Sequence, residues 1–416
     1  MGAKNDTDVL IERLPFIVFG VFFNVAAMPN LLKVASVQHS LQFSEVSGLI
    51  SYYQTFYGTA ALFSCYFTLN FSKKKILIIA LLAFSFLNAC IFFVTDIHRV
   101  VILRALVGIP ASMIIPTALT AIGEISKKRG KRTGIIFITT SIASTCGIFL
   151  SGFLPWRSFF LIPAIISLFN VFLLLSVKND RTDAGGNKQK VPITRIFKKY
   201  VAILFEPAIQ KIFSGIFLNA FLMASIDSYM AFFLSERLTI GQERIASILV
   251  FGTFGGIIGN YFSGKLVDGY LWFKSLWVGV VIVSVSIFFI SVNLSLPIMY
   301  MLFMSRSVGR SLIHLALVNK FVCLENEVRP YVASLNSVCV FISGSLSVFF
   351  FSSIQPIIQF EHYLLGVSVM YVMFLVVTVT YRHRVALVSG IMLHAFGIIN
   401  RLQYSYLRIG RRNDSD

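Results

Sequence analysis

Long apolar runs, separated by short polar connections, repeat along almost the whole chain. A helix that spans a membrane needs about 17–25 consecutive, mostly apolar residues. Twelve runs meet this length, and we predict one spanning helix for each. They are residues 14–35, 47–69, 76–95, 100–123, 134–154, 159–177, 212–234, 245–267, 275–294, 297–321, 331–353 and 363–381.

A hydrophilic stretch that begins at Lys178 divides these runs into two sets of six. Its charged residues, glycines and Pro192 are typical of a linker. We therefore predict four segments. They are an N-terminal six-helix bundle (1–177), a cytoplasmic linker (178–211), a C-terminal six-helix bundle (212–381) and a basic cytoplasmic tail (382–416).

The composition agrees with a membrane protein, because 56% of the residues are hydrophobic and 13% are charged, whereas soluble proteins carry about 25% charged residues. The net charge is +18. The cations concentrate in alternate connections, such as residues 73–75 and 127–132. This is the positive-inside bias of cytoplasmic connections and not a surface for nucleic acid, so we expect both termini in the cytoplasm.

A further apolar run, residues 385–399, precedes several arginines in the tail. It is short for a span, and a crossing would place the basic tail outside. We favour an amphipathic helix at the inner membrane surface over a thirteenth span. At the other end of the chain, the first apolar run is long enough to span, so we expect no cleavable signal peptide.

Residue types that bind metals or perform catalysis are dispersed. The five cysteines occur singly, without paired or metal-type spacing, and we interpret them as small buried hydrophobic residues. The six histidines also form no cluster. The sequence therefore predicts no metal site and no cofactor.

Arg104 lies inside the fourth apolar run, and Gly108, Pro110 and Pro116 follow it. A charge at membrane depth is costly and is usually retained for function. Glycine allows close approach of helices, and the prolines interrupt backbone hydrogen bonding. The alternative is a structural arginine that binds backbone carbonyls. We favour a functional role.

Arg306, Arg310 and His314 recur every four residues in the tenth run, so they share one helix face. A cavity bordered by this face would attract an anionic solute. Alternatively, Arg306 extends to the membrane interface and His314 is a core residue. Asp227, in the seventh run, is either a protonatable coupling group or a permanent partner of Arg306 or Arg310.

The two halves show a weak internal repeat, in which Arg104 of the fourth run corresponds to Arg306 of the tenth. After the eighth run, Gly264-Lys-Leu-Val-Asp268 resembles the loop motif of the major facilitator superfamily, which is glycine, any residue, leucine, any residue, aspartate. The first-half copy has Asn70 at the aspartate position.

Three further segments carry the resemblance. Arg104-Ala-Leu-Val-Gly108, with Pro116, resembles the fourth-helix motif of the drug/proton antiporter branch of that superfamily. Residues 147–152 line up with the fifth-helix antiporter motif, although isoleucine and serine replace its proline and one glycine. Pro155-Trp156-Arg157 resembles the corner before the sixth helix.

The resemblance implies an all-α membrane protein with twelve transmembrane helices in two pseudo-symmetric six-helix bundles, and a central cavity lined by the first, fourth, seventh and tenth helices. Asp227 and Arg104 are the predicted proton-coupling residues. The predicted cavity residues are Asn24, Asn30, Gln54, Tyr57, Arg104, Arg306, Arg310 and His314. The predicted gate consists of charged residues at cytoplasmic helix ends, namely Glu124, Arg132, Lys265 and Asp268.

We expect a proton-coupled secondary transporter that moves a small organic solute across a bacterial inner membrane as a monomer. The basic helix face favours an anionic metabolite, for example a carboxylate siderophore, or an anionic drug. The antiporter-like motifs favour export, and uptake by proton symport is the alternative. A polytopic membrane protein with a receptor or enzymatic role is less favoured, since the sequence shows no polar cluster of the kind that a membrane enzyme uses.

Overall fold

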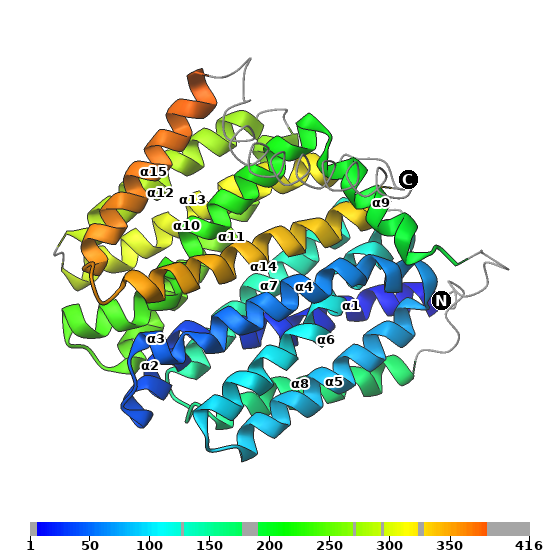
Figure 1. Ribbon diagram of the computed structural model, residues 1–416, viewed down its shortest axis with the longest axis horizontal. Coiled ribbons are helices and arrows are strands. Elements are labelled where there is room, and N and C mark those ends of the chain that lie inside the picture. The colour runs from blue at the N-terminus through cyan, green and yellow to red at the C-terminus, as the bar shows by residue number, and fades with distance from the viewer. Residues whose placement is uncertain are drawn as a thin grey trace, which may run out of the picture.

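The computed structural model describes residues 6–125, 129–176, 190–268, 272–292, 295–322 and 328–380. Within these ranges the chain folds into helices and short connections, and no strand occurs. Most of the long helices run roughly parallel or antiparallel to one another (Figure 1). The prediction of an all-α membrane protein is therefore confirmed.

Each predicted span of the first half corresponds to one helix or to a bent pair of helices. The first span is the pair α1–α2, and α4 to α8 supply the others. The bounds are α1 Asp6–Ala26, α2 Met28–His39, α3 Phe43–Val46, α4 Gly48–Asn70, α5 Lys73–Phe93, α6 Ile97–Ile125, α7 Arg129–Ser151, the 3-10 helix η1 Ser158–Phe160, and α8 Leu161–Leu175.

The second half continues in the same way, and α10 to α15 correspond to its six predicted spans. One additional helix, α9, lies inside the predicted linker and was not predicted as a helix. The bounds are α9 Ile193–Leu204, α10 Pro207–Leu238, α11 Gln242–Asp268, α12 Trp272–Ser291, α13 Leu296–Val322, α14 Arg329–Ile354 and α15 Phe360–Thr380.

By length and hydropathy, seven of the described helices can cross a membrane, or eight if the α1–α2 pair is one span. This pair bends by 42°. Pro29 stands in the first turn of α2, where it has no N–H to donate to the preceding helix and its ring clashes with that turn. The helix order fits the twelve predicted spans. The predicted tail (382–416), with its apolar run at 385–399, lies outside the described residues.

The packing of the helices repeats between the two halves. In the first half α4 packs on α6, α1 on α7, and α5 on both α6 and α8. In the second half α11 packs on α13, α10 on α14, and α12 on both α13 and α15. Each pair has its counterpart six spans later, so the chain forms two pseudo-symmetric bundles. The residue bounds given above for the two bundles remain a prediction.

Two glycines allow close helix crossings in the helix pairs α4–α6 and α11–α13, which are counterparts in the repeat. A Cβ on Gly108 would lie 2.5 Å from the backbone oxygen of Tyr53, where α6 crosses α4. A Cβ on Gly255 would lie 2.0 Å from the backbone oxygen of Met304, where α11 crosses α13. Neither crossing leaves room for a larger residue.

The two halves meet along two seams. In the α4–α14 seam, the hydroxyl oxygens of Ser64 and Ser334 are 2.7 Å apart. In the α7–α11 seam, the hydroxyl oxygens of Thr145 and Thr253 are 2.6 Å apart. We call the end of the bundle near α9 the linker end and the end near α2 and α3 the α2 end (Figure 1).

Candidate functional site

Asp227 of α10 binds two arginines of α13. Its Oδ1 atom lies 2.7 Å from Nη1 of Arg306, and its Oδ2 atom accepts a hydrogen bond from Nη1 of Arg310. The arginines are four residues apart, so one helix face presents both guanidinium groups to α10. The structure thus joins three of the predicted site residues in one ion-pair cluster, which we call the Asp227 cluster.

The two arginines of the Asp227 cluster have different surroundings. The side chain of Arg306 is 7% exposed, its guanidinium lies 5.4 Å from the centre of the Phe303 ring, and Nη1 lies 3.9 Å from the sulfur of Met223. The side chain of Arg310 is 47% exposed, and that of Asp227 is 24% exposed. Arg306 is therefore packed into the bundle, whereas Arg310 is partly exposed.

His314 follows Arg310 by one helical turn on α13 and is half-buried. One face of α13 therefore carries the guanidinium groups of Arg306 and Arg310 and the imidazole of His314, one helical turn apart, as the four-residue spacing predicted. Of these three side chains, the two arginines contact the carboxylate of Asp227. A role for His314 in the cavity remains a prediction.

Arg104 lies in a different polar network, in the first half. Its side chain is buried, and Nη1 donates a hydrogen bond to Oδ1 of Asn24. Nδ2 of Asn24 donates in turn to Oδ1 of Asn88 at 2.8 Å. The guanidinium also lies 4.3 Å from the centre of the Tyr53 ring and 5.8 Å from that of Phe160, which are favourable cation–π positions.

The Arg104 network and the Asp227 cluster share no residue. Among the described side chains, the hydrogen-bond and ring contacts of Arg104 come from α1, α4 and η1. Those of Arg306 and Arg310 come from α10 and α13. A single cavity that uses all three arginines therefore remains a prediction.

The other predicted cavity residues lie at helix contacts. Nδ2 of Asn30 donates to the hydroxyl of Ser151 at 3.0 Å and links α2 to α7. The ring of Tyr57 stacks on that of Phe341, with 3.6 Å between the centres, in the α4–α14 seam. Gln54 lies in the same seam, against Gly344.

These three residues retain unused polar atoms. Oδ1 of Asn30, the hydroxyl of Tyr57 and Oε1 of Gln54 are buried without a hydrogen-bond partner among the described residues. A buried polar atom of this kind is unfavourable unless a ligand or water binds it. Their prediction as solute contacts stands untested.

The four residues of the predicted gate stand near helix ends. Glu124 falls near the end of α6, Arg132 near the start of α7, and Lys265 and Asp268 in the last turn of α11. Their side chains lie outside the described residues.

A cavity of about 380 Å³ at the α2 end was missed by sequence reasoning. Its lining includes Lys33 from the first half and Glu236 and Gln355 from the second. Phe43 closes one side, with its ring 4.9 Å from that of Tyr229. Charged residues at helix ends are common in membrane proteins, so Lys33 and Glu236 gave no distinct signal.

Asn88 was also not predicted as a site residue, although its position in the sequence indicates a polar contact between helices. It is a carboxamide inside the third apolar run, where a polar side chain needs a partner in a neighbouring helix. The sequence therefore contained a reason to include it, but not the identity of the partner.

Comparisons with known proteins agree with this architecture. The family model of the Major Facilitator Superfamily matches residues 15–348. Multidrug resistance protein 2 of Bacillus subtilis (strain 168) is 22% identical over 273 residues, which are 62% of this chain and 66% of that protein. The chain thus matches slightly less than two thirds of the length of this relative.

Three solved structures share the fold. The human organic anion transporter MFSD10 (TETRAN) has a TM-score of 0.68 and 12% identity, with 89% of this chain and 98% of that chain covered. A variant of the nucleoside transporter NupG has a TM-score of 0.70 and 11% identity, with 88% of this chain and 99% of that chain covered. The third structure is a bacterial homologue of the human lysosomal transporter Spinster in an inward-facing and occupied conformation. It has a TM-score of 0.66 and 14% identity, with 90% of this chain and 96% of that chain covered.

The paired bundles, the charged residues inside their helices and a family match that covers most of the chain have one common explanation. This chain belongs to the major facilitator superfamily, as a multi-pass membrane transporter of small solutes and not an enzyme.

Proposed function

We propose that this transporter carries a small organic anion together with a proton, with Arg306 and Arg310 as the anion site and Asp227 as the proton site. The observation that carries the proposal is that two guanidinium groups share one carboxylate. Two positive charges and one negative charge leave the Asp227 cluster with one net positive charge. Such a site attracts a carboxylate or phosphate group.

The exposure of Arg310 supports an exchange of partners. Its side chain is 47% exposed, compared with 7% for Arg306. A solute anion can therefore approach Arg310 and replace its contact with Asp227. The planar guanidinium matches two oxygens of a carboxylate or phosphate at once, which favours this class of solute.

Protonation of Asp227 would strengthen anion binding. A neutral carboxyl group no longer pairs with the arginines, so both guanidinium charges become available to the solute. Binding linkage is reciprocal, and the bound anion must therefore also favour the protonated form of Asp227. Two ligands that promote each other's binding cross the membrane together.

This linkage supports proton symport, which was the alternative to export in the sequence analysis. The positive-inside bias supports a cytoplasmic position for the linker end and the termini, in a bacterial inner membrane. With an inward proton gradient, symport gives uptake. We also propose a monomer as the transporting unit, since each chain contains both bundles.

Proton-driven export is the second candidate, because the Bacillus subtilis relative is named as a multidrug resistance protein. Antiport requires that the solute and the proton exclude each other. A cationic drug would satisfy this requirement at Asp227, but it would meet two guanidinium groups there. The charge of the cluster therefore argues against a cationic substrate.

Transport by the purified protein in lipid vesicles tests the proposal. Labelled citrate, benzoate and glucose 6-phosphate serve as anion probes, under an imposed pH gradient of either direction. We expect at least one probe to accumulate on the side towards which protons flow. Accumulation of an anion against the proton flow would support export and contradict symport.

Asp227→Asn separates coupling from binding. We expect this variant to retain exchange of labelled for unlabelled anion and to lose accumulation driven by protons, because the amide cannot release a proton. Glu361→Gln is the matched control, since Glu361 also pairs with an arginine, Arg237, but outside the Asp227 cluster. Proton-driven accumulation by Asp227→Asn would contradict the assignment of Asp227.

A further inference from the structure

Helix α9 is fastened to the linker end of the bundle. The hydroxyl of Tyr200 donates to the backbone oxygen of Leu62 at 2.9 Å, and its ring lies 5.9 Å from the ring of Tyr331 at the start of α14. At the end of α4, Asn70 donates to the backbone oxygen of Val191 at 3.0 Å and accepts from its N–H at 2.7 Å. These contacts fix both the position and the rotation of α9.

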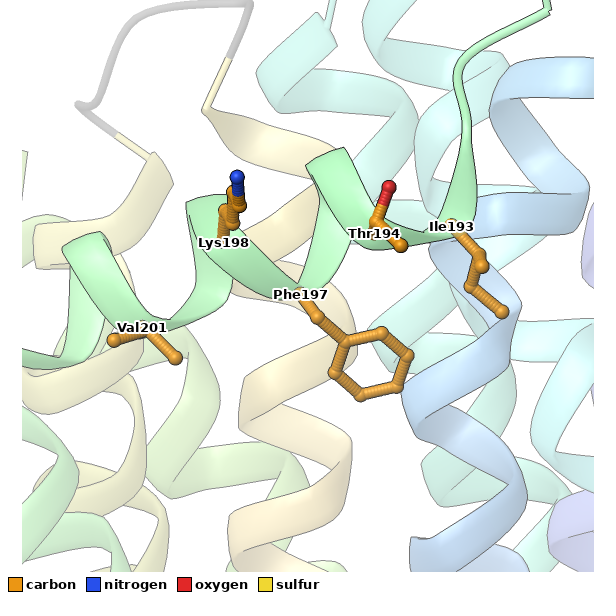
Figure 2. A pocket seen from close by; sticks show the side chains of 5 residues that line it. All are labelled: Ile193, Thr194, Phe197, Lys198 and Val201. Carbon is orange, nitrogen blue, oxygen red and sulfur yellow. The ribbon is translucent and has the colours of Figure 1, made fainter. Parts of the chain in front are cut away.

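A second face of α9 is apolar but exposed. The exposed fractions are 39% for Ile193, 38% for Phe197 and 52% for Val201. These residues line a cavity of about 440 Å³. Figure 2 shows α9 running across the direction of the neighbouring helices, with Phe197 and Ile193 on one side of it and Lys198 on the other. An exposed apolar face on a fixed helix indicates a surface that something else covers.

The third face of α9 is basic. Arg195, Lys198 and Lys199 are exposed, and the sequence of the helix contains no acidic residue. A helix with an apolar face and a basic face lies in the surface of a bilayer, where its apolar residues enter the acyl boundary and its cations meet anionic headgroups.

The position of α9 allows the bilayer to cover its exposed apolar face. The neighbouring helices cross the membrane, so a helix that runs across them at the end of the bundle lies parallel to the membrane plane (Figure 2). We propose that α9 binds the leaflet at the linker end. Ile193, Phe197 and Val201 enter it, and the basic face holds the phosphate groups of anionic phospholipids. This surface is separate from the solute site.

The depth of α9 is tested with the full chain in vesicles of phosphatidylglycerol and phosphatidylcholine. Single cysteines for spin labels replace Phe197, Val201, Thr194 or Lys198, in a background in which the native cysteines are replaced. Labels at positions 197 and 201 are expected to collide with oxygen, which concentrates in lipid. Labels at 194 and 198 are expected to collide with a water-soluble nickel complex.

Two results would overturn the proposal. Equal access of nickel to all four positions would mean that the apolar face lies in water. Spin–spin broadening between copies at position 197, together with a disulfide between chains, would mean that a second copy covers this face. Both measurements are independent of solute and of transport.

The headgroup preference is tested with a fluorescent label at position 197 and with brominated phospholipids as quenchers. We expect stronger quenching by brominated phosphatidylglycerol than by brominated phosphatidylcholine. The substitutions Arg195→Gln, Lys198→Gln and Lys199→Gln should each reduce this preference by about fivefold. Arg99→Gln, in the first turn of α6, is the control and should not reduce it. Equal quenching by the two lipids in the parent chain would exclude anionic-lipid binding.

Discussion

The guanidinium of Arg104 donates a hydrogen bond to the side-chain oxygen of Asn24, 80 residues earlier in the chain. Among the described side chains no carboxylate pairs with Arg104. The charge is instead held by this carboxamide and by the faces of Tyr53 and Phe160. Asn24 therefore supplies the side-chain oxygen that binds Arg104, as Asp227 does for Arg306. Unlike Asp227, it does not neutralise the charge of the arginine.

Asn24→Leu should destabilise the protein, because it leaves the Arg104 guanidinium buried with one hydrogen bond fewer. The expected loss in the free energy of unfolding is about 1–3 kcal/mol, seen as a lower melting temperature in detergent. Asn24→Asp is the matched variant, since it keeps an acceptor for Arg104 and loses only the donor to Asn88, and it should melt above Asn24→Leu. An unchanged melting temperature for Asn24→Leu would show that the Arg104 contact is not needed for stability.

The helices were predictable because lipid requires each span to be long and apolar and to satisfy its own backbone hydrogen bonds. The run at 47–69, for example, became α4, Gly48–Asn70. Helix α9 was missed because a short helix with apolar and basic faces has the composition of a linker. The pairs of polar side chains that meet between helices were only partly predictable. Asp227 was named as a partner of Arg306 or Arg310 because opposite charges in a membrane attract.

The contact between Arg104 and Asn24 was beyond sequence reasoning. Both residues were predicted to face one cavity, and their spacing along the chain carries no information on which polar side chains meet after packing. Asn70 was noted only as a departure from the family aspartate. Its two hydrogen bonds to Val191 join the end of α4 to the residues just before α9, and no periodic pattern in the sequence predicts such a contact.

The two arginines of the Asp227 cluster should respond differently to the same substitution. Arg310→Gln, at a 47% exposed side chain, should preserve folding and weaken binding of the transported anion by about 10–100-fold, the range for loss of a charged hydrogen bond. Arg306→Gln, at a 7% exposed side chain, should also lower the melting temperature. Anion binding is measured by equilibrium titration of the purified variants. Equal anion affinity in Arg310→Gln and the parent would remove Arg310 from the solute site.

Gly108→Ala should destabilise the first bundle. The new Cβ would lie 2.5 Å from the backbone oxygen of Tyr53, so α4 and α6 must separate, at a cost of about 1–3 kcal/mol. Gly366→Ala in α15 is the matched control, because nothing lies within 4 Å of its Cβ position. Thermal unfolding of both variants checks the difference. A similar melting temperature for the two would contradict the tight crossing.

A covalent link across the α4–α14 seam should stop transport. Alternating access moves one bundle against the other, and the hydroxyl oxygens of Ser64 and Ser334 are close enough, at 2.7 Å, for a disulfide between cysteines at these positions. We expect oxidation of the double cysteine variant, with Cys65 replaced, to abolish anion exchange and reduction to restore it. Cysteines at Ser284 and Ser368, which link α12 to α15 within one half, should leave exchange intact. Full exchange through the oxidised Ser64–Ser334 link would mean that this seam does not open.

Asn70 stands where the family loop motif has aspartate, yet Asn70→Asp should loosen the linker. The carboxamide is matched to Val191 because it offers a donor to the backbone oxygen and an acceptor to the N–H. A carboxylate keeps the acceptor but loses the donor and repels the carbonyl oxygen. Hydrogen exchange at the Val191 amide should therefore rise modestly in Asn70→Asp, and by about tenfold or more in Asn70→Ala, where both bonds are lost. Exchange at the parent rate in both variants would show that the side chain of Asn70 does not hold Val191 in place.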